Sequence, residues 1–116
     1  MSDFRKLNIY NEGVEFVTKI YEFTSLFPKE EKYGLVDQIK RASVSIVLNI
    51  AEGSGNNSKA EFARFLRMSL RSLYEVDAIL ELSIKLKFCK HRDIEDIYKR
   101  RLKLGNMLGR LLKSLL

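Results

Sequence analysis

The sequence predicts an all-α fold, an antiparallel up-down-up-down four-helix bundle. Apolar residues recur every three or four positions through four successive segments, the spacing that places them on one face of a helix. Short connections separate these segments, and short connections favour antiparallel neighbours. With 116 residues, of which 46% are hydrophobic and 31% charged, the chain is expected to form a single domain over residues 1–116.

The first helix is predicted over residues 7–26. Its side chains repeat along two neighbouring helical rows: Tyr10, Val14, Val17, Tyr21 and Thr24 on one, and Phe16, Ile20, Phe23 and Phe27 on the next. The only proline, Pro28, suits the opening turn of a helix but not its interior, so it marks the end of this segment.

A second helix is predicted over residues 29–52, because Glu30 and Glu31 complement the positive N-terminal dipole of a helix that starts after Pro28. Its core row is Leu35, Ile39, Ala42 and Ile46. The helix is expected to end where residues that tolerate left-handed backbone conformations gather, namely Gly53, Gly55, Asn56 and Asn57.

Ser58 followed by Glu61 has the spacing of a capping box, which predicts the start of a third helix over residues 58–87. Its core rows are Phe62, Leu66, Ser69, Leu73, Val76 and Leu80, and Phe65, Ser72, Ile79 and Leu86. A fourth helix is predicted over residues 92–114, since acidic residues stand near its start and cations toward its end. Its apolar row is Ile94, Ile97, Leu104, Leu108, Leu111 and Leu115.

Residues 43–50 of the second helix alternate in hydropathy and are rich in β-branched side chains, but their neighbours favour a helix over a strand. As a helix this stretch is apolar nearly all round, and a small bundle cannot bury a whole helix circumference. We therefore predict that the outer residues Val44, Val47 and Leu48 form a subunit interface of a homo-oligomer. The alternative is a few exposed aliphatic side chains without a partner.

The sequence contains few residues that could bind a metal ion or form a catalytic site. His91 is the one histidine and Cys89 the one cysteine, so no metal site, internal disulfide or cofactor is expected, and no catalytic set emerges. The loop from Gly53 to Lys59 precedes a helix, but it lacks the order of a phosphate-binding P-loop. Asn49 falls on a core row with Glu52 three residues on, for which a structural role is preferred to an active-site pair.

Charge is uneven along the chain. The formal net charge is +6, yet residues 1–58 carry 7 basic and 8 acidic groups, whereas residues 59–116 carry 14 basic and 7 acidic groups. One stripe of the third helix holds Arg64, Arg67 and Arg71, and the fourth helix holds Lys99, Arg100, Arg101 and Lys103 in a stretch without acids. These residues are candidates for phosphate contacts with nucleic acid, and the alternative is a solvated basic surface.

Two further features of the sequence concern helix packing and membrane insertion. Gly105 and Gly109, four residues apart, could let helices approach closely. No apolar run approaches the roughly 20 residues that span a bilayer, and the first residues lack the apolar region of a signal peptide. We therefore expect a cytoplasmic protein without a membrane partner.

The chain resembles the 23S rRNA intervening-sequence proteins, the four helix bundle proteins of bacteria. The resemblance spans nearly the whole sequence, and its most specific part is the segment from Gln38 to Gly53, with the motif residues Gln38, Arg41, Ser45, Asn49, Glu52 and Gly53. Three departures are visible: Val47 replaces a common proline, Arg71 a common glycine, and Lys87-Phe88-Cys89 a glycine-aromatic ending.

The resemblance implies a four-helix bundle assembled as a ring-like pentamer, of a family whose genes are often found inside intervening sequences of bacterial 23S rRNA genes and to which no enzymatic activity is attached. The chain is also similar to the accessory variability protein of diversity-generating retroelements, a basic pentameric bundle that binds nucleic acid and a reverse transcriptase. Three functional hypotheses follow. The first is a non-enzymatic RNA- or DNA-binding oligomer, the second a scaffold that docks an acidic protein or a nucleic-acid enzyme, and the third an enzyme built around Glu52 and Asn49.

Overall fold

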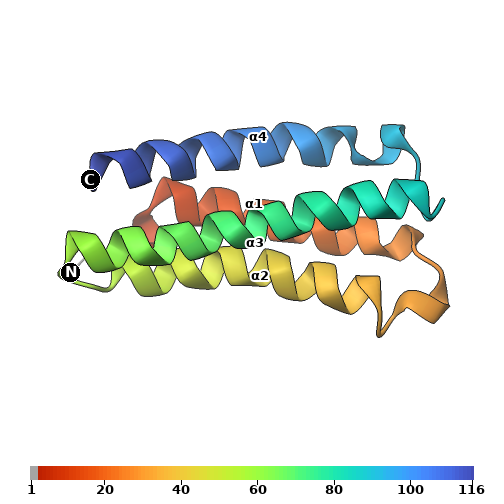
Figure 1. The fold of residues 1–116 in the computed structure, drawn as a ribbon, viewed down its shortest axis with the longest axis horizontal. Coiled ribbons are helices and arrows are strands. Elements are labelled where there is room, and N and C mark those ends of the chain that lie inside the picture. Colours follow the sequence, from red (N-terminus) through yellow and green to blue (C-terminus); the bar gives the residue numbers. More distant parts are fainter. Residues whose placement is uncertain (1–2) are drawn as a thin grey trace.

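Four long helices run side by side in the computed structural model, which describes residues 3–116 (Figure 1). They are α1 (Asn8–Phe23), α2 (Leu35–Ser54), α3 (Lys59–Lys85) and α4 (His91–Ser114). Helices α1 and α3 each pack against both α2 and α4, so every neighbouring pair is antiparallel. The described residues contain no strand, and the prediction of an all-α, up-down-up-down four-helix bundle is confirmed.

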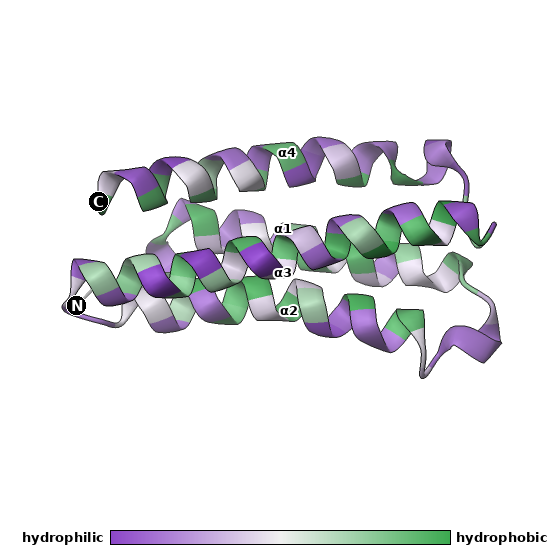
Figure 2. Cartoon of the chain, viewed as in Figure 1, coloured by the Kyte–Doolittle hydropathy of each residue, from purple (hydrophilic) through white to green (hydrophobic). Residues whose placement is uncertain are grey.

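The core is formed by most of the side chains in the predicted rows, but Val14, Tyr21 and Leu86 are 38%, 44% and 49% exposed and lie outside it. Along each helix, hydrophobic and hydrophilic residues alternate with the helical repeat (Figure 2). The largest fully buried side chains come from all four helices: Phe16, Ile20, Ile39, Ile46, Ile50, Leu66, Leu73, Val76, Leu80, Ile94, Leu104 and Leu108. Both described ends of the chain lie at the same end of the bundle, together with the connection from α2 to α3 (Figure 1).

The connection between α1 and α2 differs from the prediction. Helix α1 ends at Phe23 and two 3₁₀ turns follow, η2 (Thr24–Leu26) and η3 (Lys29–Glu31). The predicted start of the second helix at residue 29 is wrong, because Pro28 opens only the second of these turns. Helix α2 begins at Leu35, whose backbone N–H donates to the Glu31 carboxylate at 3.1 Å.

The end of α2 also differs, because no described glycine has a positive φ angle. The helix continues through Gly53 to Ser54, and Gly53 instead permits a close approach of α2 to α3. A Cβ atom at Gly53 would lie 2.7 Å from the Cβ of Phe65 and 2.9 Å from the Cδ1 of Phe62. The one described residue with a left-handed backbone is Lys87, at the end of α3.

Helices α3 and α4 begin with side-chain caps. The Oγ of Ser58 accepts the backbone N–H of Glu61 at 3.2 Å, as the Ser-Glu spacing predicts. The Glu61 carboxylate forms an ion pair with Arg64. At α4, the Asp93 carboxylate accepts the backbone N–H of Lys90 at 2.8 Å.

Candidate nucleic-acid interface

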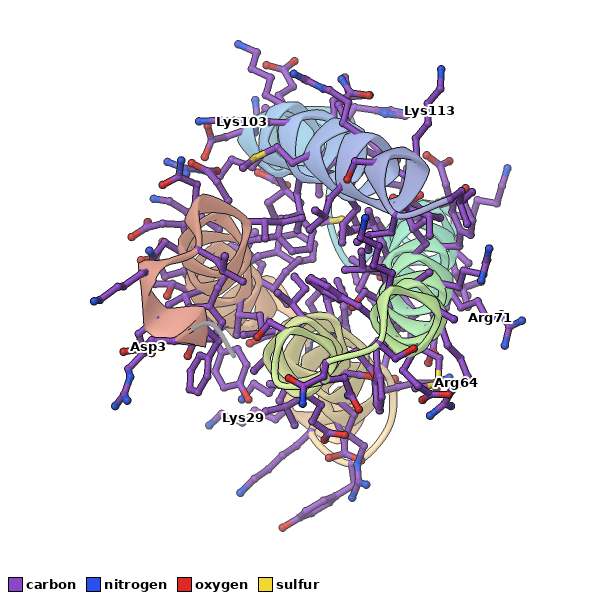
Figure 3. All side chains as sticks on the ribbon, turned by 90° about the vertical axis from the view of Figure 1, so that its left-hand side faces the viewer. Asp3, Lys29, Arg64, Arg71, Lys103 and Lys113 are labelled. Atoms are coloured by element: carbon purple, nitrogen blue, oxygen red, sulfur yellow. The ribbon has the colours of Figure 1, made fainter. Side chains whose placement is uncertain are left out.

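Three arginines form one exposed stripe on the outer face of α3. Arg64, Arg67 and Arg71 follow one another at spacings of three and four residues, and all three are exposed. Because a helix rises 1.5 Å per residue, the stripe extends for about 10 Å. Arg64 and Arg71 point away from the core on the same side of the bundle (Figure 3). The stripe, defined here as Arg64, Arg67 and Arg71, is open to a ligand.

The three arginines differ in their partners. Arg64 forms an ion pair with Glu61 at 2.9 Å and lies 4.6 Å from the centroid of the Phe65 ring. Hydrogen bonding to Glu61 raises the pKa of Arg64 above its usual value. Within residues 3–116, no carboxylate lies within 4.0 Å of Arg67 or Arg71, so these two guanidinium groups can contact a phosphate without leaving another partner.

Three of the four candidate cations on α4 are held in ion pairs. Arg101 makes a bidentate contact with Asp77 of α3, with a shortest N–O distance of 2.7 Å, and only 19% of its side chain is exposed. The hydrogen bond with Asp77 raises the pKa of Arg101. Lys103 binds Glu12 of α1 at 2.9 Å, and Arg100 binds Asp96 at 3.3 Å. The exposed Lys99 is the one candidate on α4 that forms no ion pair with the described residues.

The structure does not gather the seven candidate cations on one surface. Arg101 lies level with Asp77, and Arg64 precedes Asp77 on α3 by a distance of about 20 Å along the helix axis. Lys103 lies on the side of α4 that faces α1, whereas Arg71 points outward from α3 (Figure 3). The arginine stripe and the α4 cations are therefore separate features.

Lys113 was not among the predicted contacts, although it lies on the α3 side of α4 (Figure 3). It is exposed, and it stands in the last turn of α4 at the end of the bundle where α3 begins. A signal for it existed in the sequence, because antiparallel packing brings the end of a fourth helix to the start of the third. The arginine stripe and Lys113 thus occupy the same end of the molecule.

The motif residues of α2 fall into two groups. Ser45 joins α2 to α3, because the Ser72 Oγ donates to its hydroxyl at 3.0 Å. Within α2, the Asn49 amide donates to the Ser45 carbonyl at 2.8 Å and to the Ser45 Oγ at 3.1 Å. Beside them, the buried Ser69 Oγ donates to the Ile46 carbonyl at 2.8 Å. Gln38, Arg41 and Glu52 are exposed, and Arg41 pairs with Asp37 at 2.9 Å.

This arrangement gives Asn49 a structural partner, since its amide binds Ser45 and not Glu52. Among residues 3–116, no group of three or more His, Cys, Asp or Glu side chains could hold a metal ion. Cys89 is buried, and desolvation with the nearby Asp93 charge raises the pKa of its thiol. None of these groups forms a nucleophile paired with a base.

An apolar groove of about 150 Å³ lies between α1 and α2. It is lined by Val14, Val17, Thr18, Val44, Val47 and Leu48. The three predicted interface residues sit differently in it: Val47 is buried against Gly13 of α1, Val44 is half-buried and Leu48 is 54% exposed. Val14 adds a further exposed aliphatic side chain on α1. No helix of residues 3–116 has the length and hydropathy needed to cross a membrane.

Comparisons with known proteins give one family and one fold. A family model described as 23S rRNA-intervening sequence protein matches residues 5–110. A crystal structure of a protein of unknown function from the S23 ribosomal protein family of Bacteroides thetaiotaomicron VPI-5482 is similar at 25% identity and a TM-score of 0.79. The match covers 90% of this chain and 98% of that one. No curated protein matches the chain.

Proposed function

Because this chain belongs to the 23S rRNA-intervening sequence protein family, we propose that it is a non-enzymatic protein that binds nucleic acid through the arginine stripe of α3. The observation that carries the proposal is the free state of Arg67 and Arg71, two exposed guanidinium groups on adjacent helical turns with no carboxylate partner among the described residues. Arginine recognises phosphate through two parallel hydrogen bonds, so such a pair suits a polyanion better than an isolated cation does.

The charge of the rest of α4 supports the same assignment. From Ile97 onward the sequence has six cations and no acid, and Lys113 lies beside α3 at the end of the bundle that carries the stripe. A surface of one sign raises the local concentration of an oppositely charged ligand and speeds its association. Lys99, Arg110 and Lys113 form no ion pair with the described residues and contribute to this field, whereas the charges of Arg100, Arg101 and Lys103 are neutralised by their carboxylate partners.

We also propose that the chain works as a homo-oligomer. The groove between α1 and α2, with Leu48 and Val14 at its mouth, is the surface assigned to a second copy. A chain with a formal charge of +6 would present that charge several times around an assembly, which strengthens attraction to a polyanion. The number five comes only from the family resemblance. We also propose, from the apolar patterning of the sequence, that the protein is cytoplasmic.

The test is a fluorescence-anisotropy titration of a labelled RNA hairpin and of duplex DNA across a salt series. The variant replaces Arg64, Arg67 and Arg71 with Ala, and the control makes an equal charge change with Lys29→Ala, Lys32→Ala and Lys85→Ala at exposed sites without ion pairs. We expect the arginine variant to bind more weakly. Its slope of log K against log salt on duplex DNA should fall by roughly 0.9 for each lost phosphate contact. The lysine control should retain most of the wild-type slope.

Two results would contradict the proposal. Equal losses in both variants would mean that only net charge matters and that the stripe is not an interface. Absence of binding by the wild type even at low salt would remove nucleic acid as the ligand, and would favour a scaffold that docks an acidic protein or a nucleic-acid enzyme.

A further inference from the structure

The arginine stripe continues along α3 into an exposed aromatic side chain. Tyr74 follows Arg71 by three residues, which places the two on the same face of the helix, and 59% of Tyr74 is exposed. The aromatic ring of Tyr74 therefore lies next to Arg71 at the end of the stripe and is open to solvent.

Arg101 of α4 lies against the Tyr74 ring. Its guanidinium carbon is 5.8 Å from the ring centroid, within the range of a cation–π contact. Arg101 is fixed there by the bidentate ion pair with Asp77, and its side chain is mostly buried. The ring of Tyr74 is thus supported on one side by a rigid cation while more than half of its surface stays open.

Gly105 leaves room for the Arg101 side chain in this position. A Cβ atom at position 105 would lie 2.7 Å from the Nη1 of Arg101 and 3.5 Å from Leu73, so any larger residue would displace the guanidinium. The sequence suggested that Gly105 and Gly109 could let two helices approach closely. In the structure, Gly105 lies against the side chain of Arg101, which belongs to the same helix. The support beneath Tyr74 therefore depends on residues from both α3 and α4.

The charges around Tyr74 favour an anionic ligand with a flat surface. Arg71 lies on one side of it along α3, and Arg101 lies at its ring. The ion pair between Arg101 and Asp77 neutralises both of these charges, so the free cation beside Tyr74 is Arg71 and Arg101 serves to support the ring. Glu75 is the one exposed carboxylate next to Tyr74 in sequence, and adjacent residues on a helix project in different directions.

Building on the proposed function, we infer that this surface selects single-stranded nucleic acid by stacking an unpaired base on Tyr74 while Arg67 and Arg71 hold the neighbouring phosphates. Stacking on aromatic side chains beside a basic track is how proteins bind single strands without reading sequence, because every base has a π face. In a duplex the bases are stacked on each other and are closed to Tyr74. The stripe and Tyr74 together extend for about 15 Å along α3, enough for a short single-stranded segment.

The test compares labelled single-stranded oligothymidylate with its duplex with oligodeoxyadenylate, again by anisotropy. The variants are Tyr74→Leu, which removes the ring, and Tyr74→Phe, which keeps it. The control is Tyr33→Leu, since Tyr33 is 85% exposed and precedes α2 at the other end of the bundle. Circular dichroism melting verifies that each variant folds.

We expect Tyr74→Leu to weaken single-strand binding roughly 5- to 150-fold, the effect of losing one stacked base, with little change for the duplex. Tyr74→Phe and Tyr33→Leu should bind like the wild type. The salt slope should stay constant in Tyr74→Leu, because stacking releases no counterions.

The outcomes separate this inference from the proposed function. Single-strand binding that is unchanged in Tyr74→Leu, or lost equally for single strand and duplex, would overturn the stacking role while the arginine stripe could still hold phosphate. A wild type that binds neither ligand would overturn both the stacking role and the nucleic-acid function.

Discussion

At the scale of the residue, Lys87 holds the most unusual backbone in the described chain. Its φ angle is 65°, and it closes α3 with two hydrogen bonds: Phe88 N–H to the Ser83 carbonyl and Lys87 N–H to the Ile84 carbonyl, both at 2.9 Å. This pair of bonds is the Schellman motif, in which glycine usually takes the left-handed position. Lys87 stands where the resembled family has a glycine, and it adopts the left-handed conformation at a steric cost.

We predict that Lys87→Gly stabilises the protein by about 0.5–1 kcal/mol. The relief of left-handed strain is worth roughly 1–2 kcal/mol, and part of it is offset by the greater freedom of glycine in the unfolded chain. The measurement is the free energy of unfolding in urea at one fixed protein concentration. As a control, Lys85→Gly lies inside the last turn of α3 and should destabilise by about 1 kcal/mol. A loss of stability in Lys87→Gly would mean that its side chain outweighs the strain.

At the scale of the element, the contact between α2 and α3 depends on small residues. Ser45, Ser69 and Ser72 exchange hydrogen bonds across it, and Gly53 lies against Phe62 and Phe65. Side chains this small let the two backbones approach closely enough for the Ser69 hydroxyl to reach a main-chain carbonyl of α2. Packing between α2 and α3 therefore accounts for Ser45 and Gly53 of the motif segment, whereas Gln38, Arg41 and Glu52 are exposed.

Gly53→Ala is predicted to destabilise the bundle by about 1–3 kcal/mol, because the new methyl group would lie 2.7 Å from the Cβ of Phe65, an atom fixed to the α3 backbone. The matched control is Gly109→Ala on α4, where an added Cβ meets nothing within 4 Å. That variant should be stabilised by up to about 1 kcal/mol through helix propensity. Thermal and urea unfolding of both variants provide the comparison. Equal effects at the two glycines would show that propensity, not packing, decides position 53.

The helices and their buried faces were predictable from the sequence because both follow from the repeat of apolar residues along a single segment. The start of α2 was not, since a proline can open a 3₁₀ turn as well as a helix, and the cap on Leu35 comes from the side chain of Glu31. A lysine by itself does not predict a left-handed backbone, so the one signal for Lys87 was its place where the resembled family has a glycine.

The candidate site was harder to predict, because its charge pairs join distant parts of the chain. Arg101 pairs with a residue 24 positions away and Lys103 with one 91 positions away. Spacing within one helix placed these cations on α4 but could not show that each forms an ion pair with a carboxylate on another helix. The α3 stripe could be placed from the sequence, since its geometry depends on a single helix.

At the scale of the whole molecule, the groove between α1 and α2 is the surface through which copies of the chain are proposed to associate. Leu48 projects from it with 54% of its surface exposed, so it should insert into the neighbouring subunit. A buried, unpaired carboxylate is costly at an interface. We therefore predict that Leu48→Glu converts an assembly of several subunits into a monomer of 13.5 kDa, measured by light scattering coupled to size-exclusion chromatography.

Leu86→Glu is the control. Leu86 is 49% exposed, a fraction similar to that of Leu48, but it lies at the C-terminal end of α3 and does not line the α1–α2 groove. It should leave the assembly intact if the α1–α2 groove is the interface. A wild type that is itself monomeric, or an assembly that survives Leu48→Glu and dissociates in Leu86→Glu, would contradict the assignment.

The same two variants connect assembly to binding, because linked sites raise apparent affinity by roughly 10²- to 10⁴-fold without new contacts. If the arginine stripes of several subunits act on one strand, Leu48→Glu should therefore weaken nucleic-acid binding although it lies on a different helix pair from the stripe.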